Sequence, residues 1–353
     1  MTDDALVIGA GPAGSVTARE LARRGRRVLM VDKATFPRAK VCGCCLNGAA
    51  VATLELLGLG HVLAGAVPLE RVTVAAGTRS ARVRLPRGVA LSRDAFDSRL
   101  IAAAVDAGVE FRPGVMMKAG DSQARVTVVA SGLTGGDATP EPQSRVGAGV
   151  LVPADRTPVF YEPGTVYMAT ARGGYVGLVR VEDGRLDVAA AFDASFLKHE
   201  GGPGPAAEVV LSEVGWPVPA GLAEMPWRGT PALTRRPTRL AGRGVFVVGD
   251  AAGYVEPFTG EGMAWAVMSA AALAPIADRA ARRWDDWCAR EWEAAHARVV
   301  ARRQRVCRVV VRVLRSPRLT GLAVRALNVF PAFARPVVAA LNRPYLPPRT
   351  SPT

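Results

Sequence analysis

The chain has 353 residues, enough for one large or two moderate hydrophobic cores, and its 49% hydrophobic and 22% charged residues are ordinary for a folded soluble protein. The net charge of +14 is uneven, because Ala294–Thr353 holds twelve arginines and no Asp or Glu. We expect no nucleic-acid partner, because no aromatic or recognition module accompanies these arginines. The N-terminus lacks the basic segment and cleavage site of a signal peptide, and no apolar run reaches the roughly 18 to 20 residues of a spanning helix. The predicted location is therefore cytoplasmic, or peripheral on the membrane.

The first segment of the chain reads as one βαβ unit. Ala5–Ile8 is a continuous apolar run, typical of a buried parallel strand, and the glycine-rich turn Gly9–Gly14 follows it. A helix is predicted over Ser15–Arg24, and a second strand over Val28–Val31 ends at Asp32.

Beyond this unit, the sequence predicts a loop at 33–48, a helix at 48–57, short strands within 70–91, a helix at 94–107 capped by Ser92 or Asp94, strands at 109–111 and 124–130, and a surface loop at 132–145. From 146 to 230 the apolar runs between glycines indicate a second sheet. The apolar run at 244–250 returns to the first sheet. A long helix at 260–281 and further helix complete the chain.

The glycine-rich turn is a candidate dinucleotide site. Gly9, Gly11 and Gly14 form a Gly-x-Gly-x-x-Gly pattern that follows a strand and opens a helix. Glycines let the backbone approach a pyrophosphate, and the N–H groups of the helix N-terminus bind it. Asp32, at the end of the next strand, can accept hydrogen bonds from ribose hydroxyls.

A second motif selects FAD over NAD. A strand ends in Gly249-Asp250, and a carboxylate there can hold the ribityl hydroxyls of a flavin. Pro257, Gly260, Gly262 and Met263 follow, at the start of a helix whose N–H groups can stabilise the negative charge of a reduced flavin. We therefore predict that FAD bridges the two motifs.

These motifs resemble those of the geranylgeranyl-reductase-like family, within the larger group of flavoproteins that includes para-hydroxybenzoate hydroxylase and the flavin-dependent halogenases. The resemblance implies an α/β fold with a Rossmann-type FAD-binding domain, an inserted antiparallel β-sheet substrate domain and C-terminal helices. The implied boundaries are 1–70, 88–145 and 240–281 for the FAD-binding domain, 71–87 and 146–239 for the substrate domain, and 282–353 for a basic helical C-terminal region.

The resemblance also assigns cofactor-binding residues. It places the pyrophosphate over Gly9, Gly11, Ala13 and Gly14, and the adenine ribose on Asp32, where the family more often has Glu, beside Lys33. It places Arg93 near the phosphate and the ribityl chain, although a solvated arginine at a helix start is an alternative. On the far side of the flavin it places Asp250, Gly262 and Met263.

The segment around Cys42-Gly43 matches the Cys-Gly that lies beside the flavin in this family, but Cys44 replaces the usual second glycine and Cys45 is added. Cys42 is a candidate catalytic residue that tunes or protonates an intermediate. The thiols could instead form a reducible disulfide, or simply pack against the cofactor. We expect no metal, since the cluster has no nearby histidine and His61, His199 and His296 form no ligand pattern.

The C-terminal arginines recur every three or four residues on one predicted helical face: Arg298, Arg302, Arg305, Arg308, Arg312 and Arg315. Such a helix could contact an anionic membrane surface or an acidic carrier protein. A solvated basic face over a hydrophobic core is the alternative.

The leading hypothesis is an FAD-dependent oxidoreductase that reduces a carbon–carbon double bond of a hydrophobic small-molecule or lipid substrate, polyprenyl or polyketide-like, by hydride transfer. The pocket is expected near Tyr167, Tyr175 and Phe192. NAD(P)H or another external reductant would supply electrons, since no second glycine motif marks a domain for it. The alternatives are a single-component FAD monooxygenase that hydroxylates an aromatic or polyketide substrate with NAD(P)H and O2, and a flavin-bearing adaptor without activity.

Overall fold

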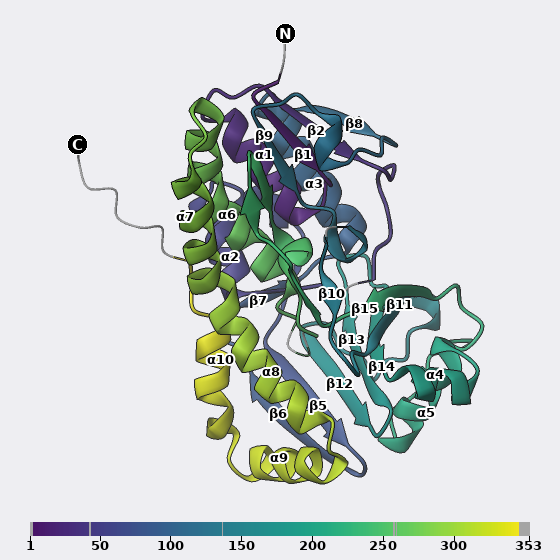
Figure 1. The fold of residues 1–353 in the computed structure, drawn as a ribbon. Helices are drawn as coiled ribbons and strands as arrows, with labels where there is room; N and C mark the ends of the chain where they lie inside the picture. The colour runs from purple at the N-terminus through teal and green to yellow at the C-terminus, as the bar shows by residue number, and fades with distance from the viewer. Residues whose placement is uncertain (1–2, 42–43, 136, 257, 259, 346–353) are drawn as a thin grey trace.

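The computed structural model describes residues 3–41, 44–135, 137–256, 258 and 260–345, and it is built on two large sheets (Figure 1). The first sheet has six strands in the order β17-β18-β9-β1-β2-β8, all parallel except β17. Its strands are β1 Ala5–Ile8, β2 Val28–Asp32, β8 Glu110–Pro113, β9 Val126–Val129, β17 Ala241–Gly242 and β18 Val245–Val247. Residues in β1 and β2 are buried without interruption, as strands covered on both faces require.

Helices from distant parts of the sequence pack beside this sheet. They are α1 Pro12–Ala22, α2 Gly48–Leu56, α3 Arg93–Asp106, α6 Gly262–Arg282 and α7 Asp286–His296. Ser92 caps α3, as predicted, because its Oγ accepts a hydrogen bond from the amide of Ala95. Helix α6 is buried over most of its length and packs against α1 and α2, so the late strand and helix complete a core begun by the first 30 residues.

The second sheet has seven strands in the order β15-β11-β14-β13-β12-β5-β6. They are β5 Arg71–Ala76, β6 Arg79–Arg84, β11 Val146–Val152, β12 Thr165–Ala171, β13 Gly174–Arg180, β14 Leu186–Phe192 and β15 Arg228–Ala232. The expectation of an antiparallel sheet is wrong at one place, since β12 and β5 are parallel. The hairpin of β5 and β6 arrives from a separate part of the chain, so no tight turn fixes its direction against β12.

Two helices cover one face of the second sheet, α4 Ala194–Glu200 and α5 Pro203–Glu213 (Figure 1). The expectation that 146–230 is mostly β missed them. The signal was present in α5, where Ala206, Ala207, Val210 and Leu211 are buried at helical spacing. They pack on the aliphatic side chains of the sheet and form a second core.

Five short strands form two further small sheets, β10-β16 and β3-β7-β4. The short strands are β3 Cys45–Asn47, β4 Val67–Pro68, β7 Gly88–Ala90, β10 Thr139–Pro140 and β16 Arg235–Arg236. The 3₁₀ turns are Gly60–Leu63, Ala119–Asp121, Gly132–Thr134, Ala154–Arg156, Gly249–Ala252 and Pro331–Ala334.

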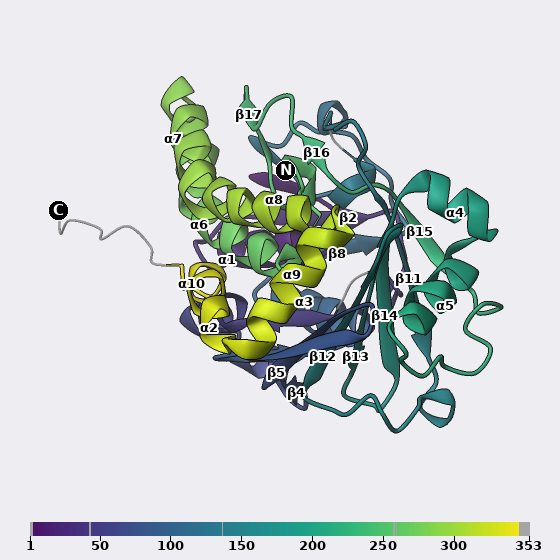
Figure 2. The same ribbon diagram turned by 90° about the horizontal axis from the view of Figure 1, so that it is seen from below.

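The C-terminal region runs alongside both sheets and ends in three helices (Figures 1 and 2). A π-helical turn at Ala297–Ala301 leads into α8 Arg302–Leu314, α9 Pro317–Val329 and α10 Arg335–Leu341. Of the predicted arginine face, Arg298, Arg302, Arg305 and Arg312 are exposed. Arg308 and Arg315 are half-buried and form ion pairs with Glu141 and Asp193 of other segments.

No single helix in the described part of the chain is long and apolar enough to cross a membrane. One bent pair, Pro317–Val329 with Pro331–Leu341, meets the length and composition test together, with a bend of 118° between its two parts.

Candidate active site

A single large cavity runs from the glycine-rich turn, along one face of the seven-stranded sheet, to the C-terminal helices. Its volume is about 1630 Å³, which exceeds the roughly 300–1000 Å³ of ordinary small-molecule pockets. The end beside β1 and β2 is lined by charged side chains such as Arg38, Lys40 and Asp250. The opposite end is lined by aliphatic side chains of β5, β6, β12 and β13 and of α8, α9 and α10.

The three glycines of the turn differ in whether the local structure requires a glycine. Gly9 has a φ of +107°, which favours glycine, and a Cβ on Gly9 or Gly14 would collide with a backbone carbonyl oxygen. Gly11 is different, because a Cβ there would meet only Arg38 Nη2, 3.9 Å away. Neither packing nor φ demands a glycine at residue 11. Its lack of a side chain widens the cavity beside the N-terminus of α1.

The first amides of α1 are available to a ligand. The amide of Ser15 donates to the carbonyl of Gly11 at 2.9 Å, and this is the first helical hydrogen bond. The amides of Gly11, Ala13 and Gly14 have no acceptor among the described residues. An anion at this turn would complete their hydrogen bonding and meet the positive end of the helix dipole.

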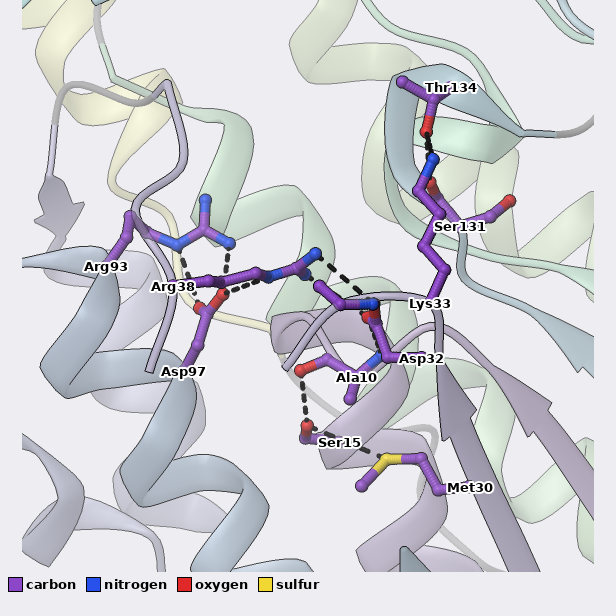
Figure 3. Close-up of polar contacts among 11 residues, drawn as sticks. Ala10, Ser15, Met30, Asp32, Lys33, Arg38, Arg93, Asp97, Ser131 and Thr134 are labelled. Atoms are coloured by element: carbon purple, nitrogen blue, oxygen red, sulfur yellow. Dashed lines mark hydrogen bonds and ion pairs between the residues drawn. The ribbon is translucent and has the colours of Figure 1, made fainter. Parts of the chain in front are cut away.

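Asp32 closes the turn from the neighbouring strand. Its buried carboxylate accepts hydrogen bonds from the amides of Ala10 at 2.8 Å and Ala34 at 2.9 Å. The guanidinium of Arg38 lies 3.4 Å from the same carboxylate and 4.0 Å from Asp97, so it stretches between two acids (Figure 3).

Arg93 is held rigidly in the wall of the cavity. Its Nε and Nη2 donate to the two oxygens of Asp97, at 2.9 and 2.8 Å, and both side chains are buried (Figure 3). A bidentate pair one turn apart in α3 fixes the plane of the guanidinium. Arg93 is therefore a buried, fixed part of the cavity wall, and the alternative of a solvated arginine at a helix start is wrong.

Lys40 and Asp250 both line the charged end of the cavity, and each affects the pKa of the other. Burial lowers the pKa of the Lys40 amine; nearby Arg93 lowers it further, while Asp250 opposes this. Burial raises the pKa of Asp250, against the opposing effect of Lys40 and Arg93. The charged end therefore holds cations suited to a diphosphate beside carboxylates suited to hydroxyl groups.

The two sequence motifs meet in space. Gly249 has a φ of +66°, and a Cβ on it would lie 2.8 Å from the Cβ of Ala13. The loop after it returns to the cavity at Gly260, whose φ is +74° and where a Cβ would lie 3.2 Å from the Cβ of Cys45. Close backbone packing thus joins the loop after β18 to the first helix.

Glu261 is a buried acid at the N-terminus of α6. It is 1% exposed and lines the cavity, and its Oε1 accepts a hydrogen bond of 2.7 Å from Asn47 Nδ2. Its Oε2 has no hydrogen-bond partner among the described residues. Burial raises the pKa of Glu261 to about 8, so the carboxyl group is largely protonated at neutral pH.

The cofactor residues expected from sequence fall into three groups. The cavity is lined by Gly9, Gly11, Asp32, Lys33, Arg93, Asp250, Gly260, Gly262 and Met263. Ala13, Gly14 and Gly249 lie behind this lining, where they pack the turn and the two motifs together. Cys42, Gly43 and Pro257 lie outside the described residues, so the catalytic role of Cys42 stays a prediction.

The expected aromatic floor of the pocket is wrong for two of its three residues. Tyr175 lines the cavity, but Tyr167 and Phe192 lie in the core under α4 and α5. Side chains alternate along a strand, so Val166 and Met168 face the cavity while Tyr167 faces away.

Cys44 and Cys45 have different surroundings in the structure. Cys44 has a φ of +48° in the left-handed region, which accounts for a glycine being usual at this place. Its side chain is 2% exposed and packs in a small apolar core, whereas Cys45 lines the cavity.

Sequence reasoning did not single out several residues of the site. Arg38 and Asn47 acquire their partners only through the tertiary fold, whereas Asp97 has a local partner, Arg93, in α3. Lys40 lies inside the stretch around Cys42-Gly43, and Glu261 lies inside the motif that follows Asp250. Their positions in these motifs could have marked both as candidate site residues.

The residues present fit FAD. The open side of Gly11 and the amides without acceptors suit a pyrophosphate, and the half-buried Arg38 and Lys40 and the buried Arg93 supply positive charge. Asp32 and Asp250 both line this end of the cavity and offer carboxylate oxygens as acceptors for hydroxyl groups. The volume beyond them leaves room for a second ligand.

Comparison with known proteins agrees with this geometry. Residues 2–155 match the model of an FAD binding domain family. The chain is 30% identical to a menaquinone reductase of Mycobacterium tuberculosis, over 92% of this chain and 90% of the relative. It is 28% identical to digeranylgeranylglycerophospholipid reductase 1 of Methanopyrus kandleri, over 74% and 77%. The fold is shared with a geranylgeranyl bacteriochlorophyll reductase-like protein of Thermoplasma acidophilum, with a TM-score of 0.76 and 18% identity over 96% and 98% of the chains.

Proposed function

The chain belongs to the geranylgeranyl reductase-like family of FAD-dependent oxidoreductases, and from this premise we propose that it reduces a carbon–carbon double bond in the polyprenyl part of a lipid-soluble substrate. The FAD-dependent oxidoreductase class follows from the family. The bond reduced and the substrate are the proposal.

The observation that carries the proposal is the division of the cavity into two chemically different ends. The charged end holds Arg38, Lys40 and Arg93, which suit the phosphates of FAD. The other end is lined by Val83, Val324 and similar side chains, with few polar groups, and suits a long hydrocarbon. A small polar substrate would leave this apolar length unfilled.

The similar reductases support a polyprenyl chain as the element that is recognised. Menaquinone and digeranylgeranylglycerophospholipid have different head groups, but both have long unsaturated isoprenoid chains. We therefore propose a quinone or a phospholipid with such a chain as substrate. The apolar end of the cavity would hold the chain.

The chemistry divides between cofactor and protein. FAD, once bound and reduced by NAD(P)H or another external donor, would supply the hydride for one carbon of the double bond. Reduction also requires a proton on the second carbon, and the Oε2 of Glu261 is the candidate source, since this carboxyl lines the cavity and is protonated at neutral pH. Asn47 orients it through Oε1, and Arg93, held by Asp97, keeps the charged end of the cavity in shape.

The proposal is tested by anaerobic turnover. Purified protein with FAD and a reductant is incubated with a polyprenyl quinone and, as a matched control, with the same quinone bearing a saturated chain. A product heavier by two hydrogen atoms, formed without oxygen and only from the unsaturated chain, is the expected result. A product that requires oxygen and gains an oxygen atom would establish the monooxygenase alternative instead. Bound FAD with no reaction of any substrate would favour an adaptor.

A further inference from the structure

Helix α9 is apolar on both of its faces. Val324 is buried on the face toward the cavity and toward β5 and β6. On the opposite face, Leu319, Leu322 and Val329 are 51%, 62% and 60% exposed. A surface helix of a water-soluble domain places polar residues on its outer face, so an apolar outer face indicates a contact with something apolar.

The exposed apolar surface continues past α9 to the mouth of the cavity. Phe330 and Phe333, whose ring centroids are 5.5 Å apart, are 58% and 64% exposed in the turn after α9. Phe333 and Val337 are exposed and also line the cavity. Side chains with both properties lie at an opening, so the apolar end of the cavity opens beside this exposed apolar surface.

The charge around this surface has one sign. Arg318 and Arg325 lie on the outer face of α9, and Arg335 begins α10; all three are exposed and have no ion-pair partner in the described part of the chain. No Asp or Glu occurs from residue 294 onward. Strand β6, which packs against α9, adds exposed arginines and no acid. The surface is therefore complementary to an anionic partner.

We propose that α9, the turn Pro331–Ala334 and α10 dock on an anionic lipid bilayer, so that the cavity mouth at Phe333 and Val337 opens to the lipid acyl chains. The arginines would meet lipid phosphates while the apolar side chains enter the interface. A second copy of the chain fits this face less well, because a symmetric contact would bring arginines against arginines. Entry of substrate from the bilayer rests on the function proposed above, whereas docking itself does not.

Vesicle flotation tests the docking. The FAD-loaded protein is mixed with vesicles of neutral phosphatidylcholine, or of phosphatidylcholine with phosphatidylglycerol, and the floating fraction is measured at increasing salt. We expect at least tenfold stronger binding to the anionic vesicles, lost at high salt. Equal binding to both vesicles, or none, would overturn the proposal. Turnover plays no part in this readout, so a failure to reduce polyprenyl substrates leaves the test intact.

Matched variants locate the surface. Leu322→Gln with Val329→Gln, and separately Arg318→Gln with Arg325→Gln, change exposed side chains that do not line the cavity. Each pair is expected to weaken vesicle binding about tenfold while FAD absorbance and Tm stay unchanged. The controls are Val105→Gln with Val159→Gln, and Arg156→Gln with Arg172→Gln, which are exposed outside the C-terminal region.

Three results would count against docking on lipid at this face. The first is a loss of vesicle binding in the control pairs equal to that in the α9 pairs. The second is a wild-type dimer that Leu322→Gln with Val329→Gln converts to a monomer, which would assign the face to a second copy of the chain. The third is binding of an acidic carrier protein with no binding to anionic vesicles.

Discussion

Asn47 and Glu261, 214 positions apart in the sequence, are joined by a hydrogen bond of 2.7 Å from Nδ2 to Oε1. Asn47 also caps α2 by accepting a hydrogen bond from the amide of Ala50, so its side chain has one orientation. The pair therefore fixes an acid at the N-terminus of α6 beside the cavity, with its second oxygen left for other partners.

The first prediction concerns the activity of Glu261→Gln. This change keeps the shape and the contact with Asn47 but removes the acidic proton, so we expect the turnover number to fall by roughly 10²-fold or more while FAD remains bound. In the wild type, turnover should decline as pH rises through about 8, because the carboxyl then ionises. Turnover by the variant should lack this decline.

Glu256→Gln is the control for this experiment. Glu256 is fully buried in the same loop, and burial raises its pKa too, but it does not line the cavity. Its variant should keep the high-pH decline of the wild type. An unchanged turnover and pH profile in Glu261→Gln would remove Glu261 from the reaction.

The second prediction concerns stability. The pKa of Glu261 is raised from 4.5 to about 8 on folding, so the unfolded chain ionises first as pH rises. The wild type should therefore lose stability between about pH 4.5 and pH 8, by on the order of a few kcal/mol, and no further above that. Gln does not titrate. Urea unfolding should show Glu261→Gln gaining stability relative to wild type from pH 5 to pH 8, and a constant difference across this range would contradict the burial of the acid.

Some residues of this site could be predicted from the sequence and others could not, and the difference has physical reasons. The glycine turn and the strand that leads to Asp250 are local patterns, so they could be found without a structure. The choice of Tyr167 failed because the side of a strand that faces a cavity depends on register against its neighbours. The pairing of Arg93 with Asp97 is local in α3, but the placing of Arg38 between Asp97 and Asp32 depends on the path of a long loop.

The third prediction concerns Cys44, whose φ of +48° costs a non-glycine residue about 1–2 kcal/mol. Cys44→Gly relieves that cost but loses a buried thiol, so the unfolding free energy should stay within about 1 kcal/mol of wild type. Cys44→Ala loses the thiol and keeps the strain. The glycine variant should therefore be at least as stable as the alanine variant, the reverse of the usual order. Thermal unfolding of both proteins decides it, and a clearly less stable glycine variant would show that the thiol contacts dominate.

The fourth prediction concerns the buried pair in α3. Arg93→Met leaves Asp97 without its bidentate partner, with Arg38 Nε 4.0 Å away. We expect a loss of about 3–5 kcal/mol in the free energy of unfolding, because an uncompensated charge stays buried. Arg93→Met with Asp97→Leu removes both charges and should recover much of this loss. A double variant no more stable than Arg93→Met would show that Asp97 is needed by Arg38 as well.

The fifth prediction separates cofactor binding from folding by comparing two glycines of one turn. A Cβ at Gly14 would collide with the carbonyl of Gly9, so Gly14→Ala should lose about 3 kcal/mol of stability or more. A Cβ at Gly11 meets only the far end of Arg38, and its φ of −76° suits alanine, so Gly11→Ala should keep or gain about 0.5 kcal/mol. The added methyl group nevertheless lies where a pyrophosphate would approach the backbone. We therefore expect FAD affinity, measured by flavin fluorescence titration, to fall at least tenfold in Gly11→Ala although the protein is folded. Unchanged affinity in a folded Gly11→Ala protein would mean that the diphosphate does not pass over this turn.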